Sequence, residues 1–258
     1  MKYFIVDAFT DHHFSGNPAG VCLLEEPIAD EIMQNIAAEN NLAETAFILK
    51  QGNEYNLRWF TPEQEFDLCG QATLASAYVL FQFVDKKAEH LVFSTQSGIL
   101  EVTRNDGLLE MDFPSRPPEQ IEVTELMENA LGVPIMEAHL SRDMILVLQT
   151  EKDVYEAVPD LDIVSKIPGC VNLIITAQGR EADFVSRYFT PGISIPEDPV
   201  TGSAHSSLIP FWAKRLGKEK LTAHQLSKRG GILYCQDKGD RVKISGNAIL
   251  YLAGEIYL

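Results

Sequence analysis

The sequence predicts an α+β protein built from two pseudo-symmetric domains, each a mostly antiparallel sheet wrapped around a central helix. Three observations predict this class: an internal repeat, one long uncharged segment in each half, and many short strands separated by turn sequences. The chain has 258 residues and is 45% hydrophobic. It can therefore bury one large core or the cores of two domains of roughly 120 residues each.

A pentapeptide occurs twice in nearly the same form, as Arg-Trp-Phe-Thr-Pro at 58–62 and as Arg-Tyr-Phe-Thr-Pro at 187–191. An acidic loop and a small-residue turn follow each copy, and the turns contain Gly70 and Gly202. The phenylalanines lie 189 − 60 = 129 positions apart and the glycines 202 − 70 = 132, so the second copy carries three extra residues. We therefore expect the two halves to share one fold.

A segment without charged residues follows each glycine, at 71–84 and at 203–213. Both segments are long enough to be helices, and a helix that is apolar on nearly all sides belongs in a core. Pro210 should kink the second helix or occupy a place where a backbone hydrogen bond is already lost. The segment 29–40 is apolar on one side only, which predicts an amphipathic helix that covers the first sheet.

The rest of the chain reads mainly as strands. Turn sequences at 105–107 and 238–240 separate consecutive strands as hairpins would. The proline-rich stretch 114–118 is the best candidate for a linker, so we place the first half at 1–114, completed by a strand at 249–258, and the second at 115–248. Strands are expected at 3–9, 19–24, 45–50, 55–60, 91–94, 99–103, 108–113, 144–149, 171–176, 182–189, 231–235, 241–244 and 248–258.

Charge and composition exclude several classes of function. The 21 Lys and Arg residues against 37 Asp and Glu give a net charge of −16, which would repel nucleic acid and anionic lipid. No stretch approaches the roughly 20 apolar residues that cross a bilayer. The four cysteines show no metal-ligand spacing and there is no dinucleotide fingerprint, so we expect neither a metal nor an organic cofactor. The start of the chain reads as a strand rather than a signal peptide, and we expect a cytoplasmic protein.

The two glycine turns are where chemistry is expected. A strand that runs into a turn and then a helix presents N–H groups and the positive end of the helix dipole at one spot. If the halves pack about a pseudo-twofold axis, the helix starts at Gly70 and Gly202 face one another across a cleft and can grip a carboxylate. Either glycine alone could instead close a tight turn beneath a buried helix. The repeat favours the binding role.

Five short motifs follow one another along the chain: Val-Asp-Ala-Phe at 6–9 with Gly-Asn-Pro at 16–18, Asn-Leu-Ala-Glu-Thr-Ala-Phe at 41–47, Asp-Leu-Cys-Gly at 67–70, Asp-Pro-Val-Thr-Gly-Ser-Ala-His at 198–205, and Ile-Ser-Gly-Asn at 244–247. In this order they resemble the PhzF family of phenazine biosynthesis-like proteins. The resemblance covers the whole chain. It implies the fold of diaminopimelate epimerase, with an active site between two halves and no metal or organic cofactor.

The resemblance also implies roles for single residues. Glu44 matches the family's catalytic glutamate, which takes a proton from one carbon and returns it to another. Asp198 and Ser203 match the acid and the hydroxyl residue that orient or protonate the substrate. Gly70 and Gly202 match the helix starts that hold its carboxylate.

Two further residues are assigned to substrate binding, Asn17 of the Gly-Asn-Pro motif and Gln71. Gln71 departs from the family, which usually has histidine at this position. An amide can donate a hydrogen bond but cannot titrate, so a proton relay through this position is lost.

Elementary chemistry supports a glutamate base but does not require one. Desolvation among Leu42, Ala46 and Phe47 is expected to raise the pKa of Glu44 towards neutrality, as removal of a carbon-bound proton demands. Glu44 could also be an ordinary exposed glutamate at a strand start, and the family motif decides against that reading.

The second-half residues have structural alternatives as well. Asp198 could form a turn or cap a helix, and Ser203 could simply begin one. His205, one turn inside a buried helix, is as consistent with a core histidine as with an active group.

The sequence therefore favours a biosynthetic isomerase that moves a proton between carbons of a small carboxylate, and we expect a homodimer. Two alternatives stay open. Gln71 keeps open a family member that binds a small carboxylate without catalysis. A cysteine-dependent amino-acid epimerase would use Cys69, which occupies the position of one of the two catalytic cysteines of diaminopimelate epimerase. The matching second position is Thr201, however, and a two-thiol mechanism needs both.

Overall fold

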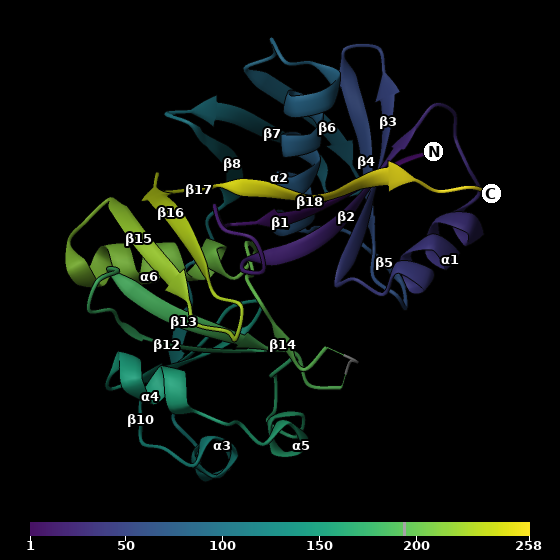
Figure 1. The fold of residues 1–258 in the computed structure, drawn as a ribbon. Coiled ribbons are helices and arrows are strands. Elements are labelled where there is room, and N and C mark those ends of the chain that lie inside the picture. The colour runs from purple at the N-terminus through teal and green to yellow at the C-terminus, as the bar shows by residue number, and fades with distance from the viewer. Residues whose placement is uncertain (193–194) are drawn as a thin grey trace. The chain divides into compact units, whose positions relative to one another are not determined.

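The computed structural model describes residues 1–192 and 195–258, and the chain divides into two compact units (Figure 1). The first unit contains residues 1–112 and 245–258, and the second contains residues 113–244. The sequence placed these boundaries at 114/115 and 248/249. Both ends of the chain therefore belong to the first unit.

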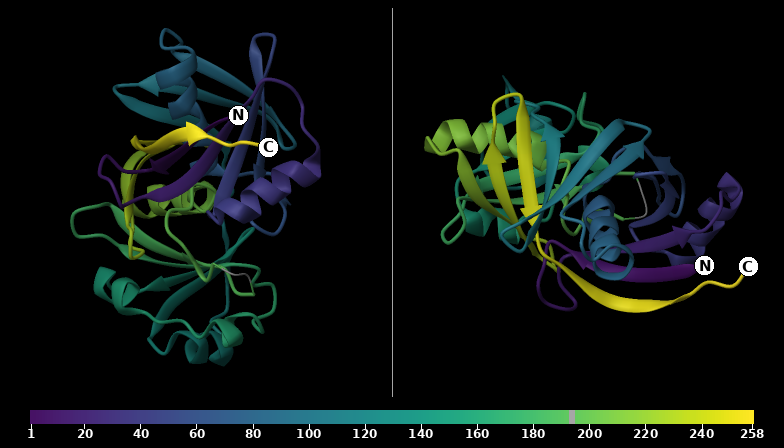
Figure 2. Two further views of the ribbon diagram at one scale, coloured as in Figure 1. Left: turned by 45° about the vertical axis from the view of Figure 1, so that its right-hand side comes forward. Right: turned by 90° about the horizontal axis from the view of Figure 1, so that it is seen from above.

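One mixed sheet forms the first unit. Its strands are β1 (Lys2–Ala8), β2 (Asn17–Leu24), β3 (Glu44–Gln51), β4 (Glu54–Phe60), β5 (Glu65–Phe66), β6 (His90–Thr95), β7 (Gly98–Asn105), β8 (Leu108–Pro114) and β18 (Ala248–Glu255). Pairing runs in the order β18, β1, β2, β3, β4, β6, β7, β8, and β5 adds to β4. Figure 2 shows β18 in yellow beside the purple N-terminal strands. Only β2/β3 and β4/β6 are parallel among these pairs, so the sheet is mostly antiparallel.

The second unit repeats this arrangement. Its strands are β9 (Glu119–Ile121), β10 (Ile135–Leu140), β11 (Met144–Leu148), β12 (Leu173–Gln178), β13 (Phe184–Phe189), β14 (Glu197–Asp198), β15 (Lys220–Gln225), β16 (Gly231–Asp237) and β17 (Arg241–Gly246), which ends in the first unit. Pairing runs β9, β10, β11, β12, β13, β15, β16, with β11/β12 and β13/β15 parallel. The parallel pairs fall at equivalent places in both units, so the repeat extends from the pentapeptides to the sheets and confirms the predicted fold class.

The predicted central helices are present with changed ends. Helix α2 (Gly70–Val79) is buried at nine of its ten residues and packs against β1, β2, β3 and β18. It continues as a π-helical turn, Leu80–Val84, so the segment predicted as one helix changes its hydrogen bonding in the last turn. Helix α6 (His205–Leu216) begins two residues later than predicted. The backbone N–H groups of His205 and Ser206 bond to the carbonyls of Gly202 and Ser203, which form a turn before the helix.

Pro210 lies inside α6, and the bond that it cannot make is replaced. A proline has no N–H for the carbonyl four residues earlier, which here belongs to Ser206. That carbonyl accepts the backbone N–H of Arg116 at 2.9 Å instead. The proline-rich stretch 114–118 is therefore attached to α6 by a backbone hydrogen bond.

Shorter helices cover the outer faces. Helix α1 (Asp30–Asn40) packs Met33, Ile36 and Ala37 against Cys22 and Phe47 of the sheet, as its pattern predicts. The sequence interpretation missed α3 (Glu125–Leu131), α4 (Glu151–Glu156) and α5 (Leu161–Val164), and with them strands β9, β10 and β15. The short strands β5 and β14 lie where it expected acidic loops. Helices of four to seven residues are too short to display a 3.6-residue period. In the part of the chain that the structure describes, no helix is long and apolar enough to cross a membrane.

The turn before β2 depends on glycine, which can be tested by substitution. Gly16 has φ of +67°, and a Cβ there would lie 2.2 Å from the Ala8 carbonyl oxygen. Gly239 also has positive φ, +83°, but nothing lies within 4 Å of its Cβ position. We expect Gly239→Ala to lower the free energy of unfolding by about 1–2 kcal/mol from backbone strain alone. Gly16→Ala should cost at least twice that in urea-induced unfolding, because the clash adds to the strain. Equal losses would contradict the close approach at Gly16.

Candidate active site

In the first unit, Glu44 and Gln71 meet. Glu44 is the first residue of β3, and Gln71 lies in the first turn of α2. The Gln71 Nε2 atom donates to Glu44 Oε2 at 2.6 Å. Glu44 is half-buried and Gln71 is buried. The structure thus brings the predicted base and the residue that departs from the family pattern into direct contact.

Asn17 lies on the same face and at the same end of this sheet as Glu44. Strands β2 and β3 run parallel, and Ala19 pairs with Glu44. Asn17 is the first residue of β2 and, two positions before Ala19, points to the face that Ala19 occupies. Asn17 is fully buried. Its assignment to substrate binding stays a prediction.

The helix start at Gly70 is shaped by Cys69. Cys69 precedes α2, and its Sγ accepts the backbone N–H of Ala72 at 3.4 Å. Its carbonyl oxygen accepts both the backbone N–H and the side-chain hydroxyl of Thr73. This sulfur is thus a helix cap as well as the candidate thiol of the epimerase alternative. Gly70, the next residue in the chain and the first of α2, is buried.

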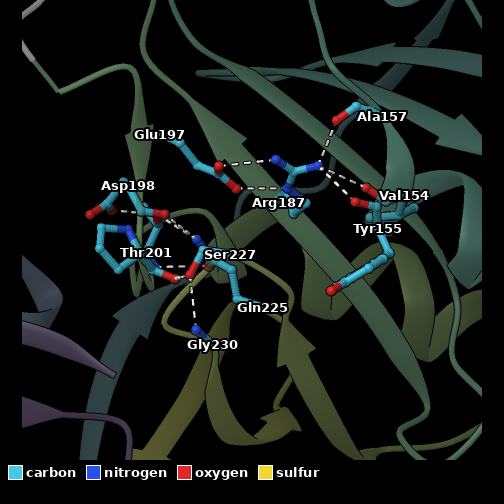
Figure 3. A network of polar contacts seen from close by, with 11 residues as sticks. Val154, Tyr155, Ala157, Arg187, Glu197, Asp198, Thr201, Gln225, Ser227 and Gly230 are labelled. Atoms are coloured by element: carbon cyan, nitrogen blue, oxygen red, sulfur yellow. Dashed lines mark hydrogen bonds and ion pairs between the residues drawn. The ribbon is translucent and has the colours of Figure 1, made fainter. Parts of the chain in front are cut away.

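In the second unit, Asp198 belongs to a polar network around Gln225 (Figure 3). The Thr201 hydroxyl donates to Asp198 Oδ2. The buried Gln225 side chain donates to the Asp198 carbonyl and to Thr201 Oγ1, and it accepts the Thr201 backbone N–H at 2.8 Å. Gln225 therefore fixes both ends of the turn that leads to Gly202, and nothing in the sequence pattern had indicated this role.

Ser203 lies just beyond this network. It is half-exposed, and its Oγ is 3.3 Å from Nη2 of Arg142, which comes from the turn between β10 and β11. Asp198, Gly202 and Ser203 thus belong to the second unit, whereas Asn17, Glu44, Gly70 and Gln71 belong to the first. Each unit contributes one group of the predicted residues.

The arginine that opens each pentapeptide holds the strand before the turn. Arg58 of β4 makes two hydrogen bonds to the Glu65 carboxylate at 2.6 and 2.8 Å, and Arg187 of β13 makes two to Glu197 at 2.7 and 3.0 Å. Each guanidinium also lies over the phenylalanine two residues on, 5.2 Å from the Phe60 ring and 4.9 Å from that of Phe189. The repeat contains the signal for these pairs, because an acidic residue follows each arginine at an offset that differs by the three extra residues.

Arg187 binds a third partner that Arg58 does not. Its Nη1 donates to the carbonyls of Val154, Tyr155 and Ala157 at the end of α4, as Figure 3 shows. Arg58 instead bonds to Asp30 at the start of α1 at 2.6 Å. The pairing is the same in both units, but the outer helix is held by its C-terminal carbonyls in one and by its first acidic residue in the other.

His205 is a core histidine with one unmatched atom. It is fully buried, and its Nδ1 lies 2.8 Å from the Thr201 carbonyl, while Nε2 has no hydrogen-bond partner among the residues that the structure describes. Burial lowers the pKa of His205 to about 4. The imidazole is therefore neutral near pH 7 and donates from Nδ1. This arrangement favours the structural reading of His205 over the active one.

Thiol chemistry gains little support. Thr201 occupies the position in the second copy of the repeat that corresponds to Cys69 in the first, and its hydroxyl donates to Asp198. Burial raises the pKa of Cys22 to about 12 and that of Cys170 to about 11, so these thiols stay protonated at neutral pH. Within residues 1–192 and 195–258, no group of three His, Cys, Asp or Glu side chains is placed to hold a metal ion.

A family model described as phenazine biosynthesis-like protein, PhzC-PhzF, matches residues 6–254. The chain belongs to this family. Among curated relatives, a Pseudomonas aeruginosa protein named an uncharacterized isomerase is 48% identical, covering 100% of this chain and 99% of that protein. A mouse phenazine biosynthesis-like domain-containing protein is 40% identical, with 99% of each chain covered.

Solved structures agree with the family assignment. A PhzF-family phenazine biosynthesis protein from Enterococcus faecalis is 50% identical and superposes with a TM-score of 0.97, covering 100% of this chain and 99% of that one. A predicted epimerase from Pseudomonas aeruginosa, only 20% identical, superposes with a TM-score of 0.79 over 100% of this chain and 99% of that one and so shares the fold. The resemblance inferred from the five motifs is confirmed.

The Arg187 pairing can be tested by removing the charge while keeping the bulk. Arg187→Met leaves the Glu197 carboxylate and three carbonyls of α4 without their donor, so we expect a loss of about 3 kcal/mol in the free energy of unfolding. Lys152→Met is the control, because the Lys152–Glu156 pair is exposed at 66% and 62% and such pairs contribute below about 0.5 kcal/mol. Similar unfolding midpoints for the two variants in urea would contradict a structural role for Arg187.

The buried histidine predicts a pH dependence of stability. Above the ordinary pKa of about 6.5, His205 is neutral in both states and contributes nothing. As pH falls towards the lowered folded pKa of about 4, only the unfolded chain binds the proton, so stability is lost. Between pH 7 and pH 5 the loss should be about 2 kcal/mol.

His205→Asn keeps a donor near the Nδ1 position and should abolish most of that loss in urea unfolding at the two pH values. His12→Asn, at an exposed position, is the control and should leave the pH dependence unchanged. An unaltered slope in His205→Asn would show that other groups cause the loss.

Proposed function

We propose that this isomerase moves a proton between two carbons of a small carboxylate substrate without a cofactor, with Glu44 as the base that removes and returns the proton. The observation that carries the proposal is the contact of the Glu44 carboxylate with Gln71 at the start of buried helix α2. A half-buried carboxylate beside a helix N-terminus combines a proton acceptor with dipoles suited to an anion.

The proposed reaction uses the ordinary weakness of a carbon acid. Glu44 takes a proton from a carbon next to a carbonyl or enamine, and the electron pair delocalises into that group. The protonated Glu44 then gives a proton to a second carbon, and exchange of its carboxyl hydrogen with water between the two steps lets solvent deuterium enter the product. N–H groups at the Gly70 and Gly202 helix starts would hold the substrate carboxylate and meet the developing charge.

A second role is proposed for two residues of the second unit. Asp198 and Ser203 would orient the substrate or supply a proton. The network of Gln225 and Thr201 supports this role, because it fixes the backbone at Asp198 and at Thr201, the residue before Gly202. A positioned donor is worth more in catalysis than a mobile one.

Gln71 keeps a second candidate function, the binding of a carboxylate without catalysis. Its amide donates to Glu44, but it cannot carry a proton onward. Incubation with small carboxylates in D₂O separates the two, since an isomerase incorporates deuterium at carbon whereas a binder does not.

The base assignment is tested by Glu44→Gln. The amide keeps shape and hydrogen bonding but removes basicity, so deuterium incorporation should fall by at least about 100-fold while ligand affinity changes little. Glu39→Gln, at an exposed position of α1, is the matched control and should retain full activity.

A Glu44→Gln variant that retains near-full turnover, or that unfolds, would return Glu44 to a structural role. Gln71→His is the informative companion. It places the family's usual residue next to Glu44, and a titratable group there should raise the rate or shift its pH dependence.

A further inference from the structure

Arg142 lies beside Ser203 although the two residues are 61 positions apart. It occupies the short turn between β10 and β11, and its Nη2 donates to Ser203 Oγ at 3.3 Å. Its Nε lies 3.6 Å from Asp143 Oδ2, and its side chain is 40% exposed. Arg142 thus differs from an ordinary surface arginine, because its guanidinium contacts both solvent and a candidate catalytic hydroxyl.

The carboxylate behind Arg142 is itself held from two directions. Asp143 is buried, and its Oδ1 accepts the Asn172 amide at 3.0 Å and the Tyr188 hydroxyl at 3.2 Å. Burial and the Asp143 charge raise the pKa of Tyr188, so its hydroxyl remains a donor. Because Asp143 is fixed, the guanidinium that it attracts has a defined position.

The direction of the Arg142–Ser203 bond is chemically determined. A guanidinium has only donors, so the Ser203 oxygen must be the acceptor. The hydroxyl hydrogen of Ser203 is therefore directed to another group. A neighbouring positive charge also favours any negative charge that develops on Oγ when that hydrogen is shared or transferred.

We infer that Arg142 is a positioning residue that makes Ser203 a hydrogen-bond donor to the substrate. The inference rests on the proposed function, because it takes Ser203 to face the substrate. It explains what an unassisted serine lacks: a free serine hydroxyl rotates among several orientations, whereas one whose oxygen accepts from Arg142 has its O–H directed away from the guanidinium and available to donate.

Kinetics of deuterium incorporation test the inference. Arg142→Gln removes the charge and should lower kcat by about 10- to 100-fold with KM changed less than about twofold, as expected for loss of a charge-assisted hydrogen bond made through another residue. Arg142→Lys should restore most of kcat. Arg180→Gln, an exposed arginine of the same unit, is the control and should behave as the parent protein.

The double variant separates positioning from a general structural effect. In a Ser203→Ala background, Arg142→Gln should cause no further loss of kcat, because the group that it positions is gone. Equal factors in both backgrounds would overturn the inference. The proposed function fails on a different result, full activity of Glu44→Gln, so the two failures are distinguishable.

A measurement without substrate tests the contact itself. The side-chain N–H signals of Arg142 in the nitrogen-15 spectrum are assigned by their loss in Arg142→Gln. Ser203→Ala should shift these signals and speed their exchange with water, whereas Arg180→Gln should not. Unchanged Arg142 signals in Ser203→Ala would overturn the inference even if no carboxylate of a test panel proves to be a substrate.

Discussion

The paired arginine and glutamate in each unit are the interaction on which the rest of the arrangement depends. Arg58 grips Glu65, and Arg187 grips Glu197, each through two hydrogen bonds. Each pair ties a long strand of the sheet to the short strand that precedes a glycine turn and a central helix. Because the guanidinium is planar and bidentate, it fixes direction as well as distance. The turn therefore starts from a determined position in both units.

The two units use the same frame to hold different polar groups. In the segment that follows the arginine–glutamate pair, the first unit places a glutamine beside Glu44, and the second places Ser203 beside Arg142. The residue before each glycine also differs, since Cys69 caps its helix with sulfur whereas the Thr201 hydroxyl bonds to Asp198. The duplicated fold therefore carries unlike polar groups at equivalent turns.

Much of the fold was predictable, and the reason lies in repetition. The pentapeptides, the uncharged segments and the glycine turns each occur twice, so each copy supported the interpretation of the other. Helices α3 to α5 occur only in the second unit, and their few residues carry no period that reveals them. Gly70 and Gly202 were indicated by the repeat, and the other candidate residues came from the family resemblance. Gln225 and Arg142 did not, because both reach the turn from strands or loops far along the chain, and such contacts leave no local pattern.

Because β18 pairs with β1, the first unit can be completed only after the second unit has been synthesised. Residues 113–244 form a continuous unit, whereas residues 245–258 complete a sheet whose other strands were made before that unit began. On the ribosome, β1 reaches solvent with one edge lacking its final neighbour and keeps it exposed until more than half of the polypeptide has followed. Nascent chains of the first unit are therefore the species that a chaperone would have to shield from edge-to-edge association, while the second unit can fold as soon as it emerges.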